Sequence, residues 1–445
     1  MSLALAAGAA ATALRGLGAA PGERVCGAVA AVDALSVEIA GLGGFLAVGS
    51  RLAILAPGGV VPAEVVALSA RGARAVAFAP LDGVRLGARV AMAGTATLAP
   101  GPGWLGRVVD PLGRPLDGRG PLPPGRHALP VRARAPEAAL RARLGPRLDL
   151  GVRALDGFCT MRRGQRLGLF AASGVGKSTL LSMLARGADC DAAVLCLVGE
   201  RGRELREFIE DDLGAAGLAR SVVVCATSDA PAPMRREAAF AAMTIAESLA
   251  GEGRHVLLMM DSVTRFALAC REIGLAAGEV PATRGHTPGV FAELPRLLER
   301  AGPCLEASGG HITGLFTVLV EGDDHDEPVA DAVRGILDGH VVLDRRIGER
   351  GRWPAIDVLR SLSRTVPGCL EPEERALATR ARAILSLAGE MADLVRLGAY
   401  RAGTDAAVDE ALRLAPRIEA CLAQRKEEPV TGVAGAFAAL QAAMA

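Results

Sequence analysis

One stretch decides the fold of this chain: Leu167-Gly-Leu-Phe-Ala-Ala-Ser-Gly-Val-Gly-Lys-Ser-Thr-Leu-Leu181. An apolar run typical of a buried strand leads into a glycine-rich turn, and residues that favour a helix follow directly. In this arrangement the backbone N–H groups of residues 174–177 can surround a phosphate, and the helix N-terminus favours its negative charge. The stretch therefore predicts a phosphate-binding loop at the carboxyl end of a strand.

The spacing within this loop assigns roles to its side chains. We expect the Lys177 ammonium to reach the β- and γ-phosphates of a nucleotide, and the Ser178 hydroxyl to bind Mg²⁺. Nucleotide contacts are expected from Ser173, Gly174, Val175, Gly176, Lys177, Ser178 and Thr179. The usual pattern has Gly where this chain has Ala171, but the intact Gly-x-Gly-Lys-Ser-Thr and the strand–loop–helix context support the prediction.

Hydrolysis of a nucleotide needs an acidic partner for Mg²⁺ and a group that orients water. Asp261 ends the apolar run 256–261, and Glu200 follows the apolar run 193–198. The carboxyl ends of parallel strands meet at one edge of a sheet, where ligands bind. We therefore expect both carboxylates beside the loop, with Asp261 on Mg²⁺ and Glu200 on the attacking water.

The rest of the chain divides by its turn signals. Strand-like and helical runs alternate around the loop, which predicts an α/β fold with a mostly parallel sheet. Short Val- and Ala-rich runs before it predict a small β-barrel, and helical spacing near the end predicts a helical bundle. We expect an N-terminal extension at 1–22, the barrel at 23–98, an ATPase domain at 99–365 and the helical domain at 366–445.

The charge balance argues against a nucleic-acid partner. The chain has 50 basic and 49 acidic residues and a net charge of +1, whereas phosphate-backbone binding relies on clustered Lys and Arg. The barrel zone holds only two aromatic residues, Phe45 and Phe78, which is few for stacking on bases. The only lysines are Lys177 and Lys426, and we expect Lys426, inside a charged run, to lie on a solvated face.

Cysteine usage and hydropathy indicate a cytoplasmic protein. The nine cysteines form no Cys-x-x-Cys pair, which predicts free thiols in a reducing compartment. The apolar first residues lack the basic residues that precede the apolar core of a signal peptide. We expect membrane association only through partners.

Further motifs resemble the signature of the type III protein-export ATPases. They are Gly199-Glu-Arg-Gly-Arg-Glu204, Phe208-Ile-Glu-Asp-Asp-Leu-Gly214, Met260-Asp-Ser-Val-Thr-Arg-Phe-Ala267 and Glu327-Pro-Val-Ala-Asp-Ala-Val-Arg-Gly-Ile-Leu-Asp-Gly-His340. The resemblance spans residues 105–364 and implies a RecA-like P-loop core shared with rotary ATP synthases. It also implies a homohexamer with nucleotide sites between neighbours. Residues 312–327 are more similar to the flagellar branch than to the virulence branch.

The resemblance implies roles for single residues as well. Arg201 and Arg265 would lie near the γ-phosphate, and Arg364 would be the arginine finger offered to the ATP of the next subunit. Trp353 falls where relatives place Tyr or Phe against adenine, and its larger ring keeps that stacking possible. Tyr400, the only tyrosine, is expected to line the same pocket.

The implied activity is ATP hydrolysis that drives flagellar protein export, with unfolding or chaperone release of substrates at the export gate. The implied partners are a stator-like regulatory subunit at the N-terminus, a central stalk, the export gate and chaperone–substrate complexes. They place the protein at the cytoplasmic face of the inner membrane. The chain departs from the family pattern at Ala172, His286 and Gly289, and we expect His286 to be a plain exposed polar residue.

Three alternatives stay open. The first is an ATPase of the virulence-type secretion apparatus. The second is a ring-shaped RNA translocase with the same core, which should carry basic and aromatic residues in its barrel and respond to single-stranded RNA. The third is a non-catalytic nucleotide-binding subunit, which should lack the water-orienting carboxylate that Glu200 supplies here.

Overall fold

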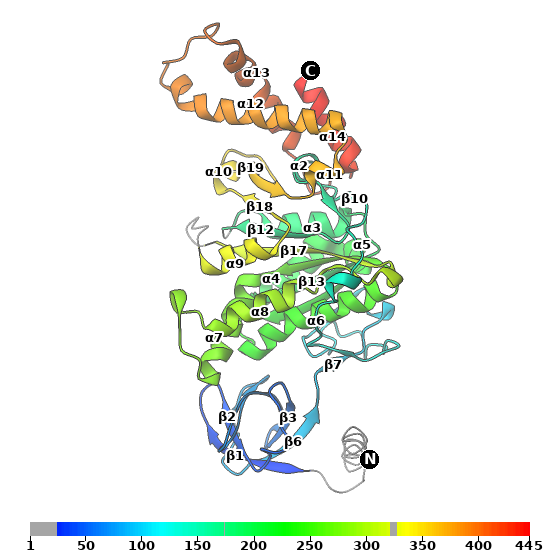
Figure 1. The fold of residues 1–445 in the computed structure, drawn as a ribbon, viewed down its shortest axis with the longest axis vertical. Helices are drawn as coiled ribbons and strands as arrows, with labels where there is room; N and C mark the ends of the chain where they lie inside the picture. The colour runs from blue at the N-terminus through cyan, green and yellow to red at the C-terminus, as the bar shows by residue number, and fades with distance from the viewer. Residues whose placement is uncertain (1–24, 173, 321–326) are drawn as a thin grey trace. The chain divides into compact units, whose positions relative to one another are not determined.

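The computed structural model describes residues 25–172, 174–320 and 327–445 of the chain. They form two compact units, which are coloured along the chain in Figure 1. The first unit comprises the residues up to Ala96 with Pro231–Pro233 and Glu272–Val280. The second comprises Thr97–Ala230, Met234–Arg271 and Pro281–Ala445. The expected N-terminal extension at 1–22 lies outside the described residues.

The first unit is built on a closed β-barrel, as predicted. Its strands are β1 (Cys26–Val32), β2 (Val37–Ala40), β3 (Arg51–Ala56), β4 (Gly59–Ser69), β5 (Gly72–Ala77) and β6 (Arg89–Gly94). They pair in the closed order β1-β2-β5-β4-β3-β6. Alternate residues such as Val37, Ile39, Leu52 and Ile54 fill the interior, because successive side chains of a strand point to opposite faces.

The second unit contains a nine-stranded sheet in the order β19-β18-β12-β17-β15-β13-β14-β8, with β16 beside β17. The strands are β8 (Arg107–Val109), β12 (Arg166–Ala171), β13 (Ala192–Glu200), β14 (Ser221–Thr227), β15 (His255–Asp261), β16 (Gly302–Pro303), β17 (His311–Leu319), β18 (Gly339–Leu343) and β19 (Ile356–Ser363). Along the main path every pair is parallel except β18 with β19. The predicted, mostly parallel α/β sheet is confirmed.

The central strands are buried on both faces. Every residue of β15 is buried, and on β13 only Glu200, at its carboxyl end, is partly exposed. Parallel strands covered on both faces consist of continuous apolar residues, so a carboxylate at a strand end stands out in the sequence. The helices around the sheet are α3 (Lys177–Gly187), α4 (Gly202–Glu207), a π-helix (Phe208–Leu213), α5 (Gly214–Ala219), α6 (Ala232–Gly251), α7 (Val263–Ala277), α8 (Pro288–Leu298), α9 (Pro328–Ile336) and α10 (Arg345–Glu349).

Short elements and three C-terminal helices complete the second unit. They are β7 (Thr97–Leu98), β9 (Leu129–Pro130), β10 (Arg147–Leu148), α2 (Arg153–Phe158), β11 (Met161–Arg162), α11 (Val366–Cys369), α12 (Pro372–Arg396), α13 (Ala406–Leu422) and α14 (Gly432–Met444). The expected helical bundle is confirmed. Helix α12 begins with a capping box between Glu371 and Glu374, and the Asp405 carboxylate caps α13. Their apolar residues share one core with α2 and α3.

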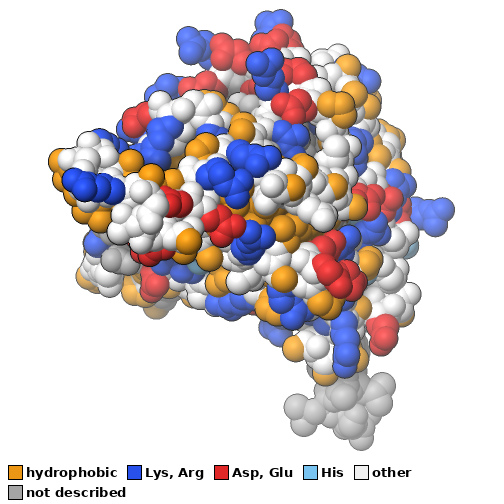
Figure 2. Space-filling view, turned by 90° about the horizontal axis from the view of Figure 1, so that it is seen from above, with side chains coloured by type: hydrophobic (Ala, Val, Ile, Leu, Met, Phe, Trp, Pro, Cys, Tyr) orange, Lys and Arg blue, Asp and Glu red, His pale blue; other side chains and the backbone are white. Residues whose placement is uncertain are grey.

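The surface carries both charges. On the face seen in Figure 2, basic and acidic side chains lie interspersed. Ion pairs such as Arg380–Glu410, at 2.5 Å, join α12 to α13. All nine cysteines lie within the described residues as free thiols. Across the described helices, none combines the length and the apolar character that a membrane span needs.

Candidate nucleotide site

The phosphate-binding loop leaves β12 after Ala171 and enters α3 at Lys177. Gly174 and Gly176 have φ values of +77° and +79°, a left-handed conformation that glycine adopts without steric cost. No described side chain caps the start of α3. Its first backbone N–H groups therefore stay available for an anion. Ser173 lies outside the described residues.

Three neighbouring strands bring polar groups to this loop. The Lys177 Nζ lies 2.5 Å from Asp261 Oδ1 and 3.9 Å from Glu200 Oε1. Asp261 lies opposite Leu197 in the parallel pair of β15 and β13, which explains why the two carboxylates meet. The Thr317 hydroxyl on β17 donates to the same Asp261 oxygen at 2.8 Å. Lys177, Asp261 and Glu200 thus meet at the sheet edge where the sequence places them.

Glu200 is the least well paired of these groups. Its Oε1 is buried and has no hydrogen-bond partner among the described residues. The nearest cations are the Arg265 guanidinium at 3.5 Å and the Lys177 ammonium at 3.9 Å. Burial, together with the nearby Asp261 carboxylate, raises the pKa of the Glu200 carboxyl above its ordinary value. The Glu200 carboxylate therefore has lone pairs available to accept a proton from a water molecule.

The two arginines expected near the γ-phosphate point in different directions. Arg265 on α7 crosses Gly199, where a Cβ atom would lie only 3.0 Å from Arg265 Cδ. Glycine at this position therefore leaves room for the Arg265 guanidinium to reach Glu200. Arg201 is exposed and pairs with Glu204 at 3.1 Å. The structure places Arg265, and not Arg201, against Glu200.

A pocket of about 770 Å³ opens beside the loop. Its lining residues are Gly174, Gly176, Thr179, Leu180, Met183, Gly351, Trp353, Pro354, Ala423, Gln424, Arg425, Lys426, Glu427 and Glu428. The Trp353 ring lies between two glycines, because a Cβ atom on Gly176 or Gly348 would come within 2.7 Å of it. Trp353 is 44% exposed, so part of its ring is available to stack on a planar base.

Sequence reasoning missed the contribution of residues 423–428 to this pocket. The Gln424 backbone N–H donates to the Trp353 carbonyl at 2.8 Å, and Arg186 at the end of α3 donates to the Lys426 carbonyl at 2.8 Å. About a third of the Lys426 side chain is exposed (34%), but it also lines the pocket and pairs with Asp212 at 3.3 Å, which its charged run did not indicate. The available signal was compositional, since Lys177 is the only other lysine of the chain.

A second pocket, of about 200 Å³, contains oxygen ligands suited to a magnesium ion. It is lined by Ser178, Leu197, Glu200, Glu204, Leu205, Glu207, Phe208, Asp212 and Asp261. Mg²⁺ binds oxygen and is usually held by one or two carboxylates plus substrate phosphates. The Ser178 hydroxyl and the Asp261 carboxylate fit that requirement beside the loop.

Tyr400 lies away from these pockets. Among the described residues, those that line the larger pocket do not include it. Its hydroxyl lies 3.0 Å from the Asp405 carbonyl and 2.9 Å from Asp409 Oδ1, in the connection between α12 and α13. The Tyr400 hydroxyl therefore holds this connection. The prediction that Tyr400 lines the nucleotide pocket is wrong.

Arg364 lies at the amino-end side of the parallel strands, whereas the phosphate-binding loop lies at their carboxyl ends. Strand β18 runs parallel to β12 and pairs Leu343 with Ala171, whereas β19 runs back and pairs Ser363 with Gly339. The six residues of β12, at about 3.3 Å each, separate the two edges. Arg364 follows β19 as an exposed residue at the far edge. This separation is too long for Arg364 to act on the loop of its own subunit.

His286 is buried, and the expectation of a plain exposed residue is wrong. It is only 5% exposed and packs edge-on against Phe291, with ring centroids 6.1 Å apart. Burial, with a further contribution from Arg271, lowers the pKa of its imidazole. Gly289 occupies the first turn of α8, directly after Pro288.

Comparisons with known proteins agree along most of the chain. The ATP synthase alpha/beta family nucleotide-binding domain matches residues 151–363, and the T3SS EscN ATPase C-terminal domain matches residues 370–442. A flagellum-specific ATP synthase of Caulobacter vibrioides is 55% identical over 410 residues, 91% of this chain and 92% of the relative. A type 3 secretion system ATPase of Xanthomonas euvesicatoria is 49% identical over 367 residues, 82% of each chain.

Solved structures give the same result for the fold. The assembled ATPase EscN from the type III secretion system of enteropathogenic E. coli matches with a TM-score of 0.86 at 36% identity. The match covers 94% of this chain and 100% of that one. EscN in complex with its central stalk EscO matches equally well, with a TM-score of 0.86.

Proposed function

This chain belongs to the family of flagellum-specific and type III secretion ATPases, and on that basis we propose that it hydrolyses ATP to ADP and phosphate to drive flagellar protein export. One observation carries this proposal: Lys177, Asp261 and Glu200 meet at the phosphate-binding loop. The pocket that contains Trp353 lies beside them. Such an arrangement holds the phosphates, the base and the attacking water of a single nucleotide.

The loop and its neighbours bind the triphosphate. The N–H groups at the start of α3 and the Lys177 ammonium hold the β- and γ-phosphates. Ser178 and Asp261 would hold Mg²⁺, which neutralises charge on the phosphate oxygens when it is bound. Lys177 now lies 2.5 Å from Asp261, so binding of the substrate exchanges that carboxylate for phosphate. Trp353 stacks on the adenine.

Glu200 orients the attacking water. Its raised pKa, and an Oε1 without a hydrogen-bond donor among the described residues, make it a stronger proton acceptor than an exposed glutamate. Arg265 holds Glu200 in place and lies next to the γ-phosphate. Arg201 reaches the γ-phosphate only when its guanidinium leaves Glu204.

Arg364 completes the site of the neighbouring subunit in a homohexamer. Its distance from its own loop along β12 supports a role in trans, as does the similarity to an ATPase that was solved in its assembled form. An arginine finger stabilises the charge that develops on the transferred phosphoryl group.

The remaining assignments rest on the resemblance to the export ATPases, and the central stalk rests also on a solved complex of a relative. We assign a central stalk as partner, as EscO is for EscN, together with a stator-like regulatory subunit on residues 1–22. The export gate and chaperone–substrate complexes are further partners, reached at the cytoplasmic face of the inner membrane. The division at 1–22, 23–98, 99–365 and 366–445 remains part of this proposal.

An export assay in the cell tests the function. A chromosomal Glu200→Gln variant should stop export of flagellar filament and hook proteins while the protein is still made and still binds ATP. A virulence-type secretion ATPase is the second candidate, because the Xanthomonas relative is 49% identical. Normal flagellar export with loss of effector secretion would establish that alternative, and stimulation by single-stranded RNA would refute both.

A further inference from the structure

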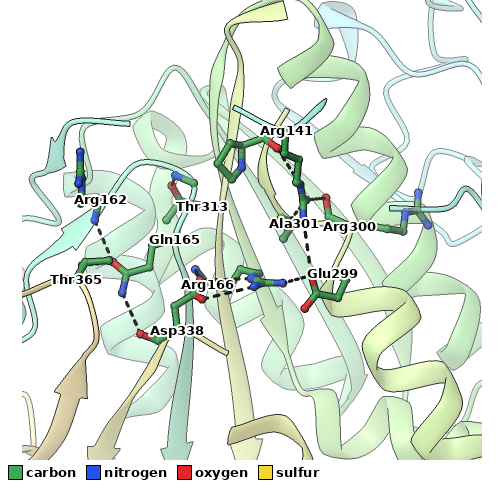
Figure 3. A network of polar contacts seen from close by, with 12 residues as sticks. Arg141, Arg162, Gln165, Arg166, Glu299, Arg300, Ala301, Thr313, Asp338 and Thr365 are labelled. Carbon is green, nitrogen blue, oxygen red and sulfur yellow. Dashed lines mark hydrogen bonds and ion pairs between the residues drawn. The ribbon is translucent and has the colours of Figure 1, made fainter. Parts of the chain in front are cut away.

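We propose that Gln165 is a positioning residue for Arg364: its buried side-chain amide fixes the residues on both sides of Arg364. The inference rests on the proposed role of Arg364 as an arginine finger. It assigns the far edge of the sheet, shown in Figure 3, to the active site of the neighbouring subunit.

The Gln165 amide uses all of its hydrogen-bonding capacity at this place. It is fully buried, and its Nε2 donates to Ser363 Oγ at 2.9 Å and to the Asp338 carbonyl at 3.3 Å. Its Oε1 accepts from Thr365 Oγ1 at 2.8 Å and from the Arg162 backbone N–H at 3.1 Å. An amide has two N–H donors and one oxygen with two lone pairs, so every position is filled.

The partners of Gln165 flank Arg364 in the chain. Ser363 precedes Arg364 and Thr365 follows it. The backbone N–H of Arg364 donates to the Asp338 carbonyl at 3.0 Å, the same oxygen that Gln165 contacts. The chain is thus held before, at and after the arginine, while the Arg364 side chain stays exposed.

Asp338 is itself held on this edge. Its carboxylate accepts the Arg166 backbone N–H at 3.0 Å and lies 3.3 Å from Arg166 Nε, and Arg166 pairs with Glu299 at 2.6 Å (Figure 3). An arginine finger acts only when its guanidinium is placed within a fraction of an ångström, and a long side chain on a mobile backbone loses that placement. Gln165 supplies the backbone placement that the exposed Arg364 needs.

Kinetics separate this role from a structural one. Gln165→Met keeps the length of the side chain but removes its four hydrogen bonds. Misplacement of a catalytic group by an ångström can cost about 10²-fold in rate, so we expect the turnover number to fall by up to that factor. The Michaelis constant for ATP should stay unchanged, because the loop at the other end of β12 is intact.

Mixed rings give the decisive readout. Gln165→Met mixed with Lys177→Ala should recover activity, because the intact loop of one subunit meets the well-placed Arg364 of the other. Gln165→Met mixed with Arg364→Ala should not recover, since both lack a working finger. Recovery with Arg364→Ala instead, or loss of ATP binding, would show that Gln165 serves its own loop and would overturn the proposal.

Two further variants keep the test interpretable. Thr365→Val removes the donor to Gln165 Oε1 with little change of volume, and it should give the same complementation class with a smaller loss if Gln165→Met does not fold. Thr379→Val, whose hydroxyl donates to its own helix at 2.8 Å on the exposed face of α12, should leave turnover unchanged. If verified rings of Lys177→Ala and Arg364→Ala fail to recover, the shared site is refuted and the role of Gln165 with it. If those rings recover but rings of Gln165→Met with Lys177→Ala do not, the role of Gln165 alone is refuted.

Discussion

The polar groups near the two ends of β12 differ in how completely their hydrogen bonds are satisfied. At the carboxyl end, Glu200 Oε1 is buried without a hydrogen-bond partner among the described residues, and Lys177 is within reach of two carboxylates. At the amino end, the Gln165 amide has every donor and acceptor filled. Unsatisfied buried groups cost free energy unless a ligand completes them, whereas a satisfied network makes the chain rigid. In the mechanism that we propose, the first group of residues binds and reacts, and the second positions the chain around Arg364.

The largest effect is expected at the carboxyl end. Lys177→Ala removes the cation that meets the β- and γ-phosphates, so ATP affinity and turnover should both become undetectable. Nucleotide binding by calorimetry and phosphate release measure the two quantities. Near-normal hydrolysis by this variant would remove the basis for treating this edge as the reactive one.

Arg364→Ala tests the other edge. It should bind ATP normally and lose about 10³–10⁵-fold in turnover, the range found for arginine fingers. Mixing it with Lys177→Ala should restore part of the activity, after co-assembly has been verified. A loss of less than tenfold would mean that the amino end of β12 does not contribute to catalysis.

Glu200→Gln separates chemistry from binding, and turnover should fall by about 10²–10⁴-fold while ATP affinity stays unchanged.

The raised pKa of the Glu200 carboxyl allows a separate test through the stability of the protein. The folded protein binds the Glu200 proton more tightly than the unfolded chain, so the wild type loses stability as the pH rises from the ordinary value of 4.5 through the raised pKa. In thermal melts without nucleotide, Glu200→Gln should be the more stable protein at neutral pH, and this difference should shrink as the pH falls towards 4.5. A difference in stability that does not depend on pH would contradict the raised pKa of the Glu200 carboxyl.

Trp353→Ala should have the smallest effect of the four. Base stacking on an aromatic ring is worth about 1–3 kcal/mol, so the Michaelis constant should rise about five- to 150-fold with little change of the turnover number. The fluorescence of Trp353 in a Trp104→Phe background provides a direct readout. The Trp353→Ala variant supplies the control, because its remaining Trp104 is buried and donates to the Pro123 carbonyl, so nucleotide should leave its fluorescence unchanged. An unchanged Trp353 signal on addition of ATP would contradict the stacking.

The parts of the site that could be predicted are those fixed by local pattern. The loop at Lys177 has its own sequence signature, and Asp261 and Glu200 follow from the rule that parallel strands end at one edge. The α/β fold could also be predicted, because the alternation of apolar strands with helices is visible in the local sequence pattern.

The parts that escaped prediction depend on contacts between distant segments. Lys426 joins the pocket because the Gln424 N–H meets the Trp353 carbonyl, and nothing in the charged run around it indicates that contact. Gln165 bonds Thr365, 200 positions along the chain. His286 is buried by packing against Phe291, and its polarity alone favoured the surface.

The presence of lysine only at Lys177 and Lys426 has a practical consequence for chemical labelling. All other basic residues are arginines, whose guanidinium groups stay protonated and do not react with amine-directed reagents near neutral pH. Both lysines lie at the loop or in the pocket beside it. Reductive methylation of the native protein should therefore modify side chains only at this site, apart from any α-amino group. Peptide mass spectrometry should show ATP shielding Lys177 from the reagent, so a fluorophore or spin label could be attached beside the nucleotide without engineering a single residue.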